Sequence, residues 1–194
     1  MNLKGLQKFI VKELKSKLSN KLTYHGLDHT DRVLDICQRY AELMQISGRN
    51  SILLDTAALM HDTGFLFTYD DHEAASIDYS KEILPKWNYN RSEIEKITKI
   101  IMATKIPQKP NTLLEQIIGD ADLDYLGTEQ FYPIGEKLYH ELMAFNKIET
   151  EEEWDRLQVD FLKNHQFHTP FAKQYREPVK LKYMYEIMEK WGWE

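Results

Sequence analysis

The 194-residue sequence contains few of the features that would place it outside a reducing compartment or in a membrane. It has a single cysteine, Cys37, which excludes an intrachain disulfide framework and predicts a cytoplasmic location. No apolar run approaches the roughly 18 residues that a membrane-spanning helix needs, so no membrane partner is expected. At the N-terminus, lysines interleave with leucine and isoleucine at helical spacing. This pattern predicts an amphipathic helix and not a signal peptide.

Positive charge is also in the minority, with 25 Lys and Arg against 31 Asp and Glu and a net charge of −6. This balance argues against broad neutralisation of a phosphate backbone, so no nucleic-acid polymer is expected as a partner. A small anionic ligand would need a local cation, such as a metal ion. Strand signals are scarce too, because no alternating run of β-branched residues is bounded by hairpin turns.

Hydrophobic residues at intervals of three and four predict an all-α protein. One helix is expected from about Asp28 to Ile46, stopped by Gly48, and a second from Ser51 to His61, with Ser51 as its cap. Further helices are expected at about 71–84, 92–103, 112–118, 129–145, 150–164 and 171–191. No repeat, low-complexity tract or linker marks a boundary, so residues 1–194 are predicted to form a single compact multi-helix bundle.

Four of the seven histidines fall within the first 72 residues, each close to a carboxylate: His25, His29, His61 and His72. His61 and Asp62 are adjacent, so on a helix their side chains diverge by about 100° and can meet at one ion only where the helix ends or bends. Gly64 allows such an ending. Imidazole and carboxylate groups together suit a divalent ion such as Mn, Fe, Zn or Ni, and with bound water also Mg.

A second set of carboxylates alternates along the segment from Gly119 to Gly127. Asp120, Asp122 and Asp124 follow an apolar run there. Buried carboxylates are costly unless they are paired or coordinated, so a cation is expected near this segment.

The order of these residues resembles the HD-domain superfamily of metal-dependent phosphohydrolases. The segments that carry the resemblance are Tyr24–Val33, Ala58–Phe65 and Asp120–Asp122. It implies an HD-type core over residues 24–127 with a helical C-terminal extension over residues 128–194. It also implies one divalent metal ion held by His29, His61, Asp62 and Asp122. Asp120 and Asp124 stay open as alternatives to Asp122, because the segment can be aligned with a shift of two residues.

The resemblance implies hydrolysis of a phosphomonoester or phosphodiester by metal-activated water, and a nucleotide is the expected substrate class. The alternative is a catalytically silent domain that binds a metal ion and a nucleotide for regulation. A homodimer is left open by the sequence.

Further residues are expected around the metal ion. Some two-metal members of the superfamily carry a histidine at a helix start that resembles His72 and Glu73, but the stretch 100–105 offers no second histidine, so one ion is expected. His72 or Glu73 would then bind phosphate, orient a water or transfer a proton, while Asp62 both ligates and positions the nucleophile. The remaining candidates, for contact with the phosphate or substrate, are Lys105, Arg32, His25 and Arg176.

Overall fold

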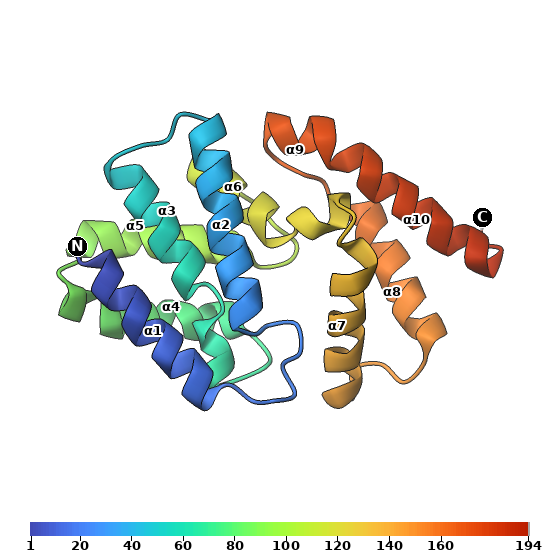
Figure 1. Ribbon diagram of the computed structural model, residues 1–194, viewed down its shortest axis with the longest axis horizontal. Coiled ribbons are helices and arrows are strands. Elements are labelled where there is room, and N and C mark those ends of the chain that lie inside the picture. Colours follow the sequence, from blue (N-terminus) through green and yellow to red (C-terminus); the bar gives the residue numbers. More distant parts are fainter. Residues whose placement is uncertain (194) are drawn as a thin grey trace. The chain divides into compact units, whose positions relative to one another are not determined.

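The computed structural model describes residues 1–193, and this part of the chain contains helices and no strand. The all-α prediction is therefore confirmed (Figure 1). The chain divides into two compact units, Met1–Asp122 and a second that begins at Leu123. A single domain over residues 1–194 stays a prediction. Within the described residues, no helix combines the length and the apolar character required to cross a membrane.

The first unit consists of α-helices joined by short loops and two 3₁₀ helices. In chain order these are α1 (Leu3–Lys17), α2 (Leu27–Leu43), α3 (Arg49–Met60), η1 (Thr63–Leu66), α4 (His72–Ile83), η2 (Leu84–Trp87), α5 (Arg91–Met102) and α6 (Leu113–Asp122). The second unit contains η3 (Asp124–Gly127), α7 (Phe131–Ala144), α8 (Glu151–Asn164), α9 (Pro170–Tyr175) and α10 (Glu177–Trp191).

Helix α3 is the centre of the first unit. Every residue from Leu53 to Met60 is buried, and α3 contacts α1, α2, α5 and α6. A helical stretch in which every residue is buried has no solvent face and lies inside the fold. Because His61 follows α3 directly, the chain carries this imidazole into the interior, where it is 1% exposed.

Two predicted helix limits are wrong because backbone conformation decides them. Helix α2 ends at Leu43 and not near Ile46, since Gln45 adopts a left-handed conformation with φ 58°. Gly48, expected to stop α2, has φ 61° and is instead the N-cap of α3, so Ser51 lies inside that helix. The end of α2 and the cap of α3 both lie earlier in the chain than the sequence signals predict.

Two later segments also differ from expectation. Helix α6 continues to Asp122, past the expected end at residue 118. The helix expected over residues 171–191 is two helices, because α10 starts afresh at Glu177 with Pro178 in its first turn. Proline lacks the N–H that a continuous helix would need at that position.

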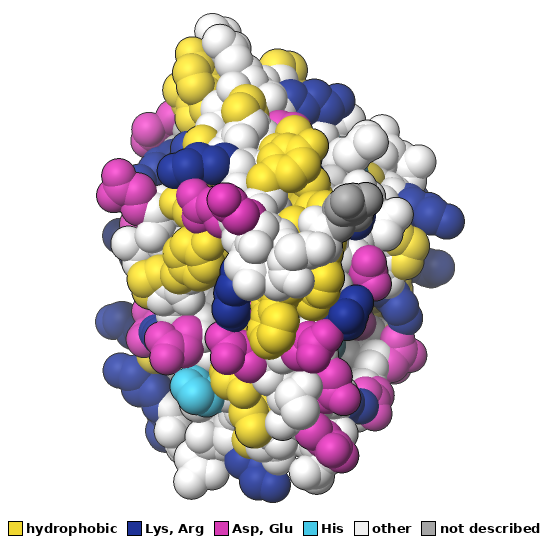
Figure 2. All heavy atoms as spheres, turned by 90° about the vertical axis from the view of Figure 1, so that its right-hand side faces the viewer, with side chains coloured by type: hydrophobic (Ala, Val, Ile, Leu, Met, Phe, Trp, Pro, Cys, Tyr) yellow, Lys and Arg dark blue, Asp and Glu magenta, His cyan; other side chains and the backbone are white. Residues whose placement is uncertain are grey.

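The second unit has its own core, in which α10 contacts α8, α9 and η3. Phe131 and Phe167 are buried there together with Lys180, whose ammonium group donates to the His165 carbonyl and pairs with Glu177. On the face of the molecule drawn in Figure 2, acidic and basic side chains are interspersed with hydrophobic ones. Such a mixed surface differs from the continuous basic stripe that binds a phosphate backbone.

The capping box of α5 offers a test of the fold alone. The Asn90 side chain accepts a hydrogen bond from Glu93 N at 3.0 Å, and the Glu93 carboxylate accepts one from Asn90 N at 2.7 Å. We expect Asn90→Ala to lower the free energy of unfolding by about 1 kcal/mol, measured by urea denaturation, because the backbone N–H of Glu93 loses its side-chain acceptor. Asn90→Ser keeps an N-cap acceptor and should restore most of the loss. Equal stability of Asn90→Ala and the unmodified protein would contradict this role.

Candidate metal centre

The backbone after α3 allows the adjacent side chains His61 and Asp62 to converge. His61 is still helical, with φ −57° and ψ −37°, whereas Asp62 leaves the helix with φ −105° and ψ 8°. The 3₁₀ helix η1 then starts at Thr63. As a result, Nε2 of His61 lies 3.0 Å from Oδ2 of Asp62. The helix end that adjacent ligands require is thus present at this position.

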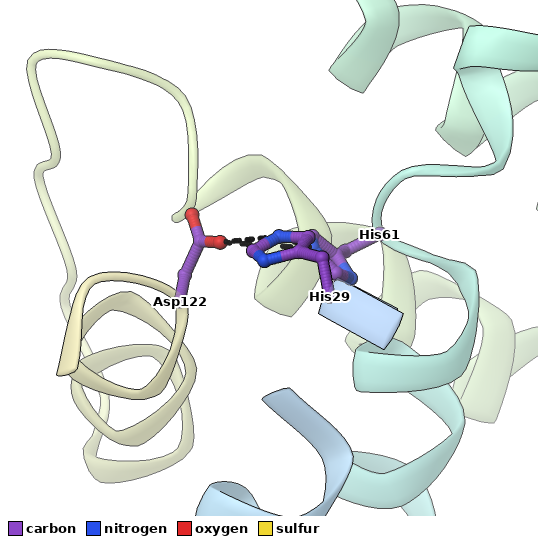
Figure 3. Close-up of side chains that lie close together, drawn as sticks. All are labelled: His29, His61 and Asp122. Carbon is purple, nitrogen blue, oxygen red and sulfur yellow. Dashed lines mark hydrogen bonds and ion pairs between the residues drawn. The ribbon is translucent and has the colours of Figure 1, made fainter. Parts of the chain in front are cut away.

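Two further elements bring donor atoms to the same place. His29, near the start of α2, has Nε2 3.1 Å from Nε2 of His61 and 3.1 Å from Oδ2 of Asp62. Asp122, the last residue of α6, has Oδ1 3.0 Å from Nε2 of His29 and 3.7 Å from Nε2 of His61. Figure 3 shows the Asp122 carboxylate facing the two imidazole rings. Two nitrogens and two carboxylate oxygens, from α2, α6 and the end of α3, thus face one point.

The four donor atoms lie close together, but hydrogen bonds among them do not satisfy all four. Oδ2 of Asp62 is buried and has no hydrogen-bond partner among the described residues, although two imidazole nitrogens lie within 3.1 Å of it. A buried carboxylate oxygen left in this way is costly and calls for an ion or a water. His29, His61 and Asp122 each offer one ligand atom within 4.8 Å of the others. The donor set therefore fits a divalent cation with mixed nitrogen and oxygen ligands.

Opposite charges within the cluster shift the pKa values of its side chains. Burial by itself raises the pKa of Asp62, but His61 and His29 beside it hold that pKa well below its usual range. The pKa of Asp122 is lowered for the same reason against the same burial. Burial would lower the pKa of His61, yet the Asp62 and Asp122 carboxylates raise it well above its usual value. The two carboxylates thus stay ionised, as ligands must be.

The outer nitrogens of the two histidines have different partners. Nδ1 of His61 lies 2.7 Å from the Ala58 carbonyl, which accepts its proton, so in the neutral ring that a metal ligand requires the Nε2 lone pair is directed at the cluster. Nδ1 of His29 lies 2.7 Å from the Arg32 guanidinium, which can only donate. A neutral His29 that ligates through Nε2 carries its proton on Nδ1, so a bound cation and this Arg32 contact exclude each other. Nothing in residue type signals the Ala58 carbonyl, and sequence reasoning missed it.

His72, a predicted catalytic residue, lies beside the cluster. Its Nε2 is 3.6 Å from Oδ1 of Asp62 and 3.7 Å from Oε1 of Glu73, and its side chain is 21% exposed. Burial lowers the pKa of His72, and the nearby His25 and His61 lower it further, while Asp62 and Glu73 raise it. The imidazole therefore tends to be neutral and able to accept a proton. Glu73 is buried next to it.

An aromatic stack holds His72 and His25 in place. The ring of Phe65 stacks on His72 with centroids 4.0 Å apart and on His25 with centroids 4.3 Å apart. Gly64 makes the close packing of η1 against α4 possible, because it has no Cβ to collide with the His72 carbonyl. Its N–H donates to Ser76 Oγ of α4 at 2.7 Å. Sequence reasoning placed His25 near the site but did not identify Phe65 or Ser76. Their role depends on the packing of η1 against α4.

The three cationic side chains predicted to bind phosphate, Arg32, Lys105 and Arg176, each have a different partner. Arg32 lies beside His29, as described above. Lys105 follows α5 and forms an ion pair with Asp71, the residue before His72, which raises the pKa of Lys105. Arg176 belongs to the second unit, where its Nε donates to Oδ1 of Asp124 at 2.7 Å.

Of the three alternating carboxylates, the structure places Asp122 beside the histidines. Asp124 instead pairs with Arg176, and Asp120 is fully buried in α6. Asp120 and Asp122 both lie in α6, where a shift of two residues turns a side chain by about 200°, and Asp124 is the first residue of η3. The assignment of Asp122 as the metal ligand stays a prediction that this geometry favours.

Comparison with known proteins supplies the family. The HD domain family matches residues 26–124, just over half of the chain. The chain belongs to the HD-domain superfamily of metal-dependent phosphohydrolases. An uncharacterized protein of Clostridium beijerinckii is 31% identical over 109 residues, which cover 53% of this chain and 67% of that protein.

Solved structures share the fold. A predicted HD superfamily hydrolase from an uncultured Thermotogales bacterium aligns with a TM-score of 0.61 at 20% identity, covering 98% of this chain and 99% of the other. Bacillus subtilis YpgQ, solved in complex with ADP, aligns with a TM-score of 0.62 at 15% identity, covering 95% and 97%. A Lactobacillus plantarum protein aligns with a TM-score of 0.69 at 16% identity, covering 98% and 97%. HD-domain proteins bind divalent metals, and the His and Asp cluster of this chain could hold one.

Gly64 offers a test of how the site is supported. A Cβ at this position would collide with the His72 carbonyl and lie 2.8 Å from Ser76 N, both backbone atoms at the start of α4. We expect Gly64→Ala to lower the free energy of unfolding by roughly 1–3 kcal/mol in urea denaturation. The matched control is Gly26→Ala, where the nearest atom is 3.6 Å away. Equal stabilities of the two variants would contradict the close approach of η1 and α4.

Proposed function

We propose that the protein is a metal-dependent phosphohydrolase that cleaves a phosphomonoester or phosphodiester bond, with a nucleotide as the substrate class. The observation that supports this proposal is the convergence of four donor atoms from His29, His61, Asp62 and Asp122, with Oδ2 of Asp62 left without a hydrogen bond. Membership in the HD-domain superfamily supports it independently. One divalent ion, of the Mn, Mg, Fe, Ni or Zn type, satisfies the donor set.

When bound at these ligands, a divalent ion supplies a nucleophilic hydroxide near neutral pH and neutralises phosphoryl oxygens. The chain's own residues do the rest. Asp62 has one oxygen toward the other ligands and the second, Oδ1, 3.6 Å from Nε2 of His72. It can therefore ligate and orient the attacking water at once. His72 is partly exposed and can exchange a proton with solvent or with the leaving group.

The proposed substrate contacts are cationic or aromatic side chains near the cluster. Lys105 is exposed and forms an ion pair with Asp71. A phosphate group would compete with the Asp71 carboxylate for the Lys105 ammonium group. With a cation held by His29, Arg32 would lose its contact with Nδ1 of His29 and could bind a phosphoryl oxygen instead. His25 stacks on Phe65 and presents a flat ring beside His72. That YpgQ was solved with ADP supports a nucleotide as the ligand class here.

The ligand set is tested by metal content. We expect Asp62→Ala and Asp122→Ala to lose the metal ion that the unmodified protein retains, because each removes an ionised ligand; such ligand losses are strongly destabilising to the site. Elemental analysis of protein purified after growth with added Mn and Fe gives the readout. The matched control is Asp124→Asn, which should retain the ion, with folding checked by circular dichroism. Metal loss from Asp124→Asn alone would overturn the assignment of Asp122.

The role of His72 is tested by turnover. We expect His72→Gln to lower kcat by roughly 10²-fold or more while metal content is unchanged, as expected for loss of a proton-transfer group. The assay uses a panel of nucleotides and an aryl phosphate with Mn, Mg, Fe, Ni and Co each supplied. His140→Gln, on the exposed face of α7 beside Glu136, is the control and should keep full activity. Unmodified protein that binds metal and nucleotide but turns over none of the panel would instead support the catalytically silent regulatory domain.

A further inference from the structure

A groove of about 650 Å³ lies in the first unit where α5 leads into α6. Basic, apolar and a few other polar side chains line it. Lys99, Lys105 and Lys109 give it positive charge, whereas Met102, Ile106 and Pro107 give it apolar surface. We call it the basic groove. Its volume is in the range of small-molecule sites, and a mixture of apolar walls with a few charged groups is typical of them.

Two of the three lysines of the basic groove form no ion pair within residues 1–193, whereas Lys105 pairs with Asp71. Among the described residues, Lys99 and Lys109 have no carboxylate partner, whereas Lys17 and Lys86 elsewhere in the unit pair with Glu13 and Glu82. The one acidic lining residue, Glu115, is buried and accepts a hydrogen bond from Asn111 N at 2.6 Å. In a protein with a net charge of −6, such a local excess of cations favours an anionic ligand.

The walls of the basic groove are held in place before any ligand arrives. Gln108 Nε2 donates to the Gly119 carbonyl of α6 at 3.0 Å, and Glu115 secures the backbone at Asn111. Met102 and Ile106 nonetheless keep 42% and 48% of their surface exposed. A fixed loop with exposed apolar side chains lowers the entropic cost of binding a flat or apolar group.

Lys105 connects the basic groove to the metal centre. It lines the groove and also pairs with Asp71. The next residue, His72, has its Nε2 3.6 Å from Asp62. A ligand anchored by a phosphate at the metal centre can therefore extend past His72 toward Lys105 and the other two lysines.

We propose that the basic groove binds the part of the substrate that lies beyond the phosphoryl group at the metal centre, and that this part carries at least one further phosphate. The substrate class is then a nucleoside di- or triphosphate, with its additional phosphates on Lys99, Lys105 and Lys109. The base would pack on Met102 and Ile106. This inference rests on the proposed function, because it takes the metal centre as the site of the reacting phosphate.

The test compares ATP with AMP. Ribose-labelled fluorescent ATP and AMP are mixed with metal-loaded protein, and anisotropy is read within seconds, before turnover. We expect the double variant Lys99→Gln/Lys109→Gln to bind ATP about tenfold more weakly, because two charge-assisted phosphate contacts are lost. Its affinity for AMP should change by less than about twofold, since the single phosphate occupies the metal centre.

The control is Lys17→Gln/Lys86→Gln, which removes the same charge from exposed lysines of the same unit. It should leave ATP binding unchanged. Unchanged ATP affinity in the groove variant, an equal loss for AMP, or an equal loss in the control would each overturn the proposal. So would binding of a polyglutamate peptide, but of neither nucleotide, to the unmodified protein.

This readout separates the two claims. Turnover of an aryl phosphate by the unmodified protein tests the proposed function without the basic groove, because that substrate carries one phosphate. If no substrate is turned over, a selective loss of ATP binding in the groove variant still supports the basic groove. If the aryl phosphate is hydrolysed while ATP binding is unaffected by the groove variant, the proposed function stands and the basic groove is wrong.

Discussion

The central constraint on the first unit is that it holds two histidines and two carboxylates, His29, His61, Asp62 and Asp122, at one place in its interior. Burying such groups is costly unless opposite charges and a cation compensate one another. His61, Asp62 and His29 are each less than one-tenth exposed, so the compensation has to come from within the cluster. Helix α3 provides the position because it is buried on all sides and stops at Met60. The polar site is thus placed by the end of a deeply buried helix.

Much of this arrangement is readable in the sequence because it follows from local rules. Apolar spacing predicts nearly all the helices, and the adjacency of His61 and Asp62 requires a helix end at that point. The order of His29, His61-Asp62 and Asp122 carries the resemblance to the HD-domain superfamily, which the family match confirms. What the sequence left open was the choice among Asp120, Asp122 and Asp124, since all three have the same chemistry.

The parts that could not be predicted depend on contacts between residues distant in the chain, or on single backbone angles. The Ala58 carbonyl that orients His61 has no side-chain signature. The pairing of Lys105 with Asp71 spans 34 positions, and that of Arg176 with Asp124 spans 52. The left-handed conformation of Gln45 ends α2 at a residue that rarely adopts it. Residue types show which groups are available, but the fold decides how they pair.

The account claims that one divalent ion binds where the four donor atoms converge. The most direct test is anomalous diffraction from crystals of the purified protein, with data collected on both sides of the absorption edge of Mn, Fe, Ni and Zn. We predict a single anomalous peak about 2.0–2.3 Å from Nε2 of His29, Nε2 of His61, Oδ2 of Asp62 and Oδ1 of Asp122. An anomalous peak at another place in a metal-loaded crystal would contradict the account. So would a cluster in which these four atoms form hydrogen bonds with one another and hold no ion.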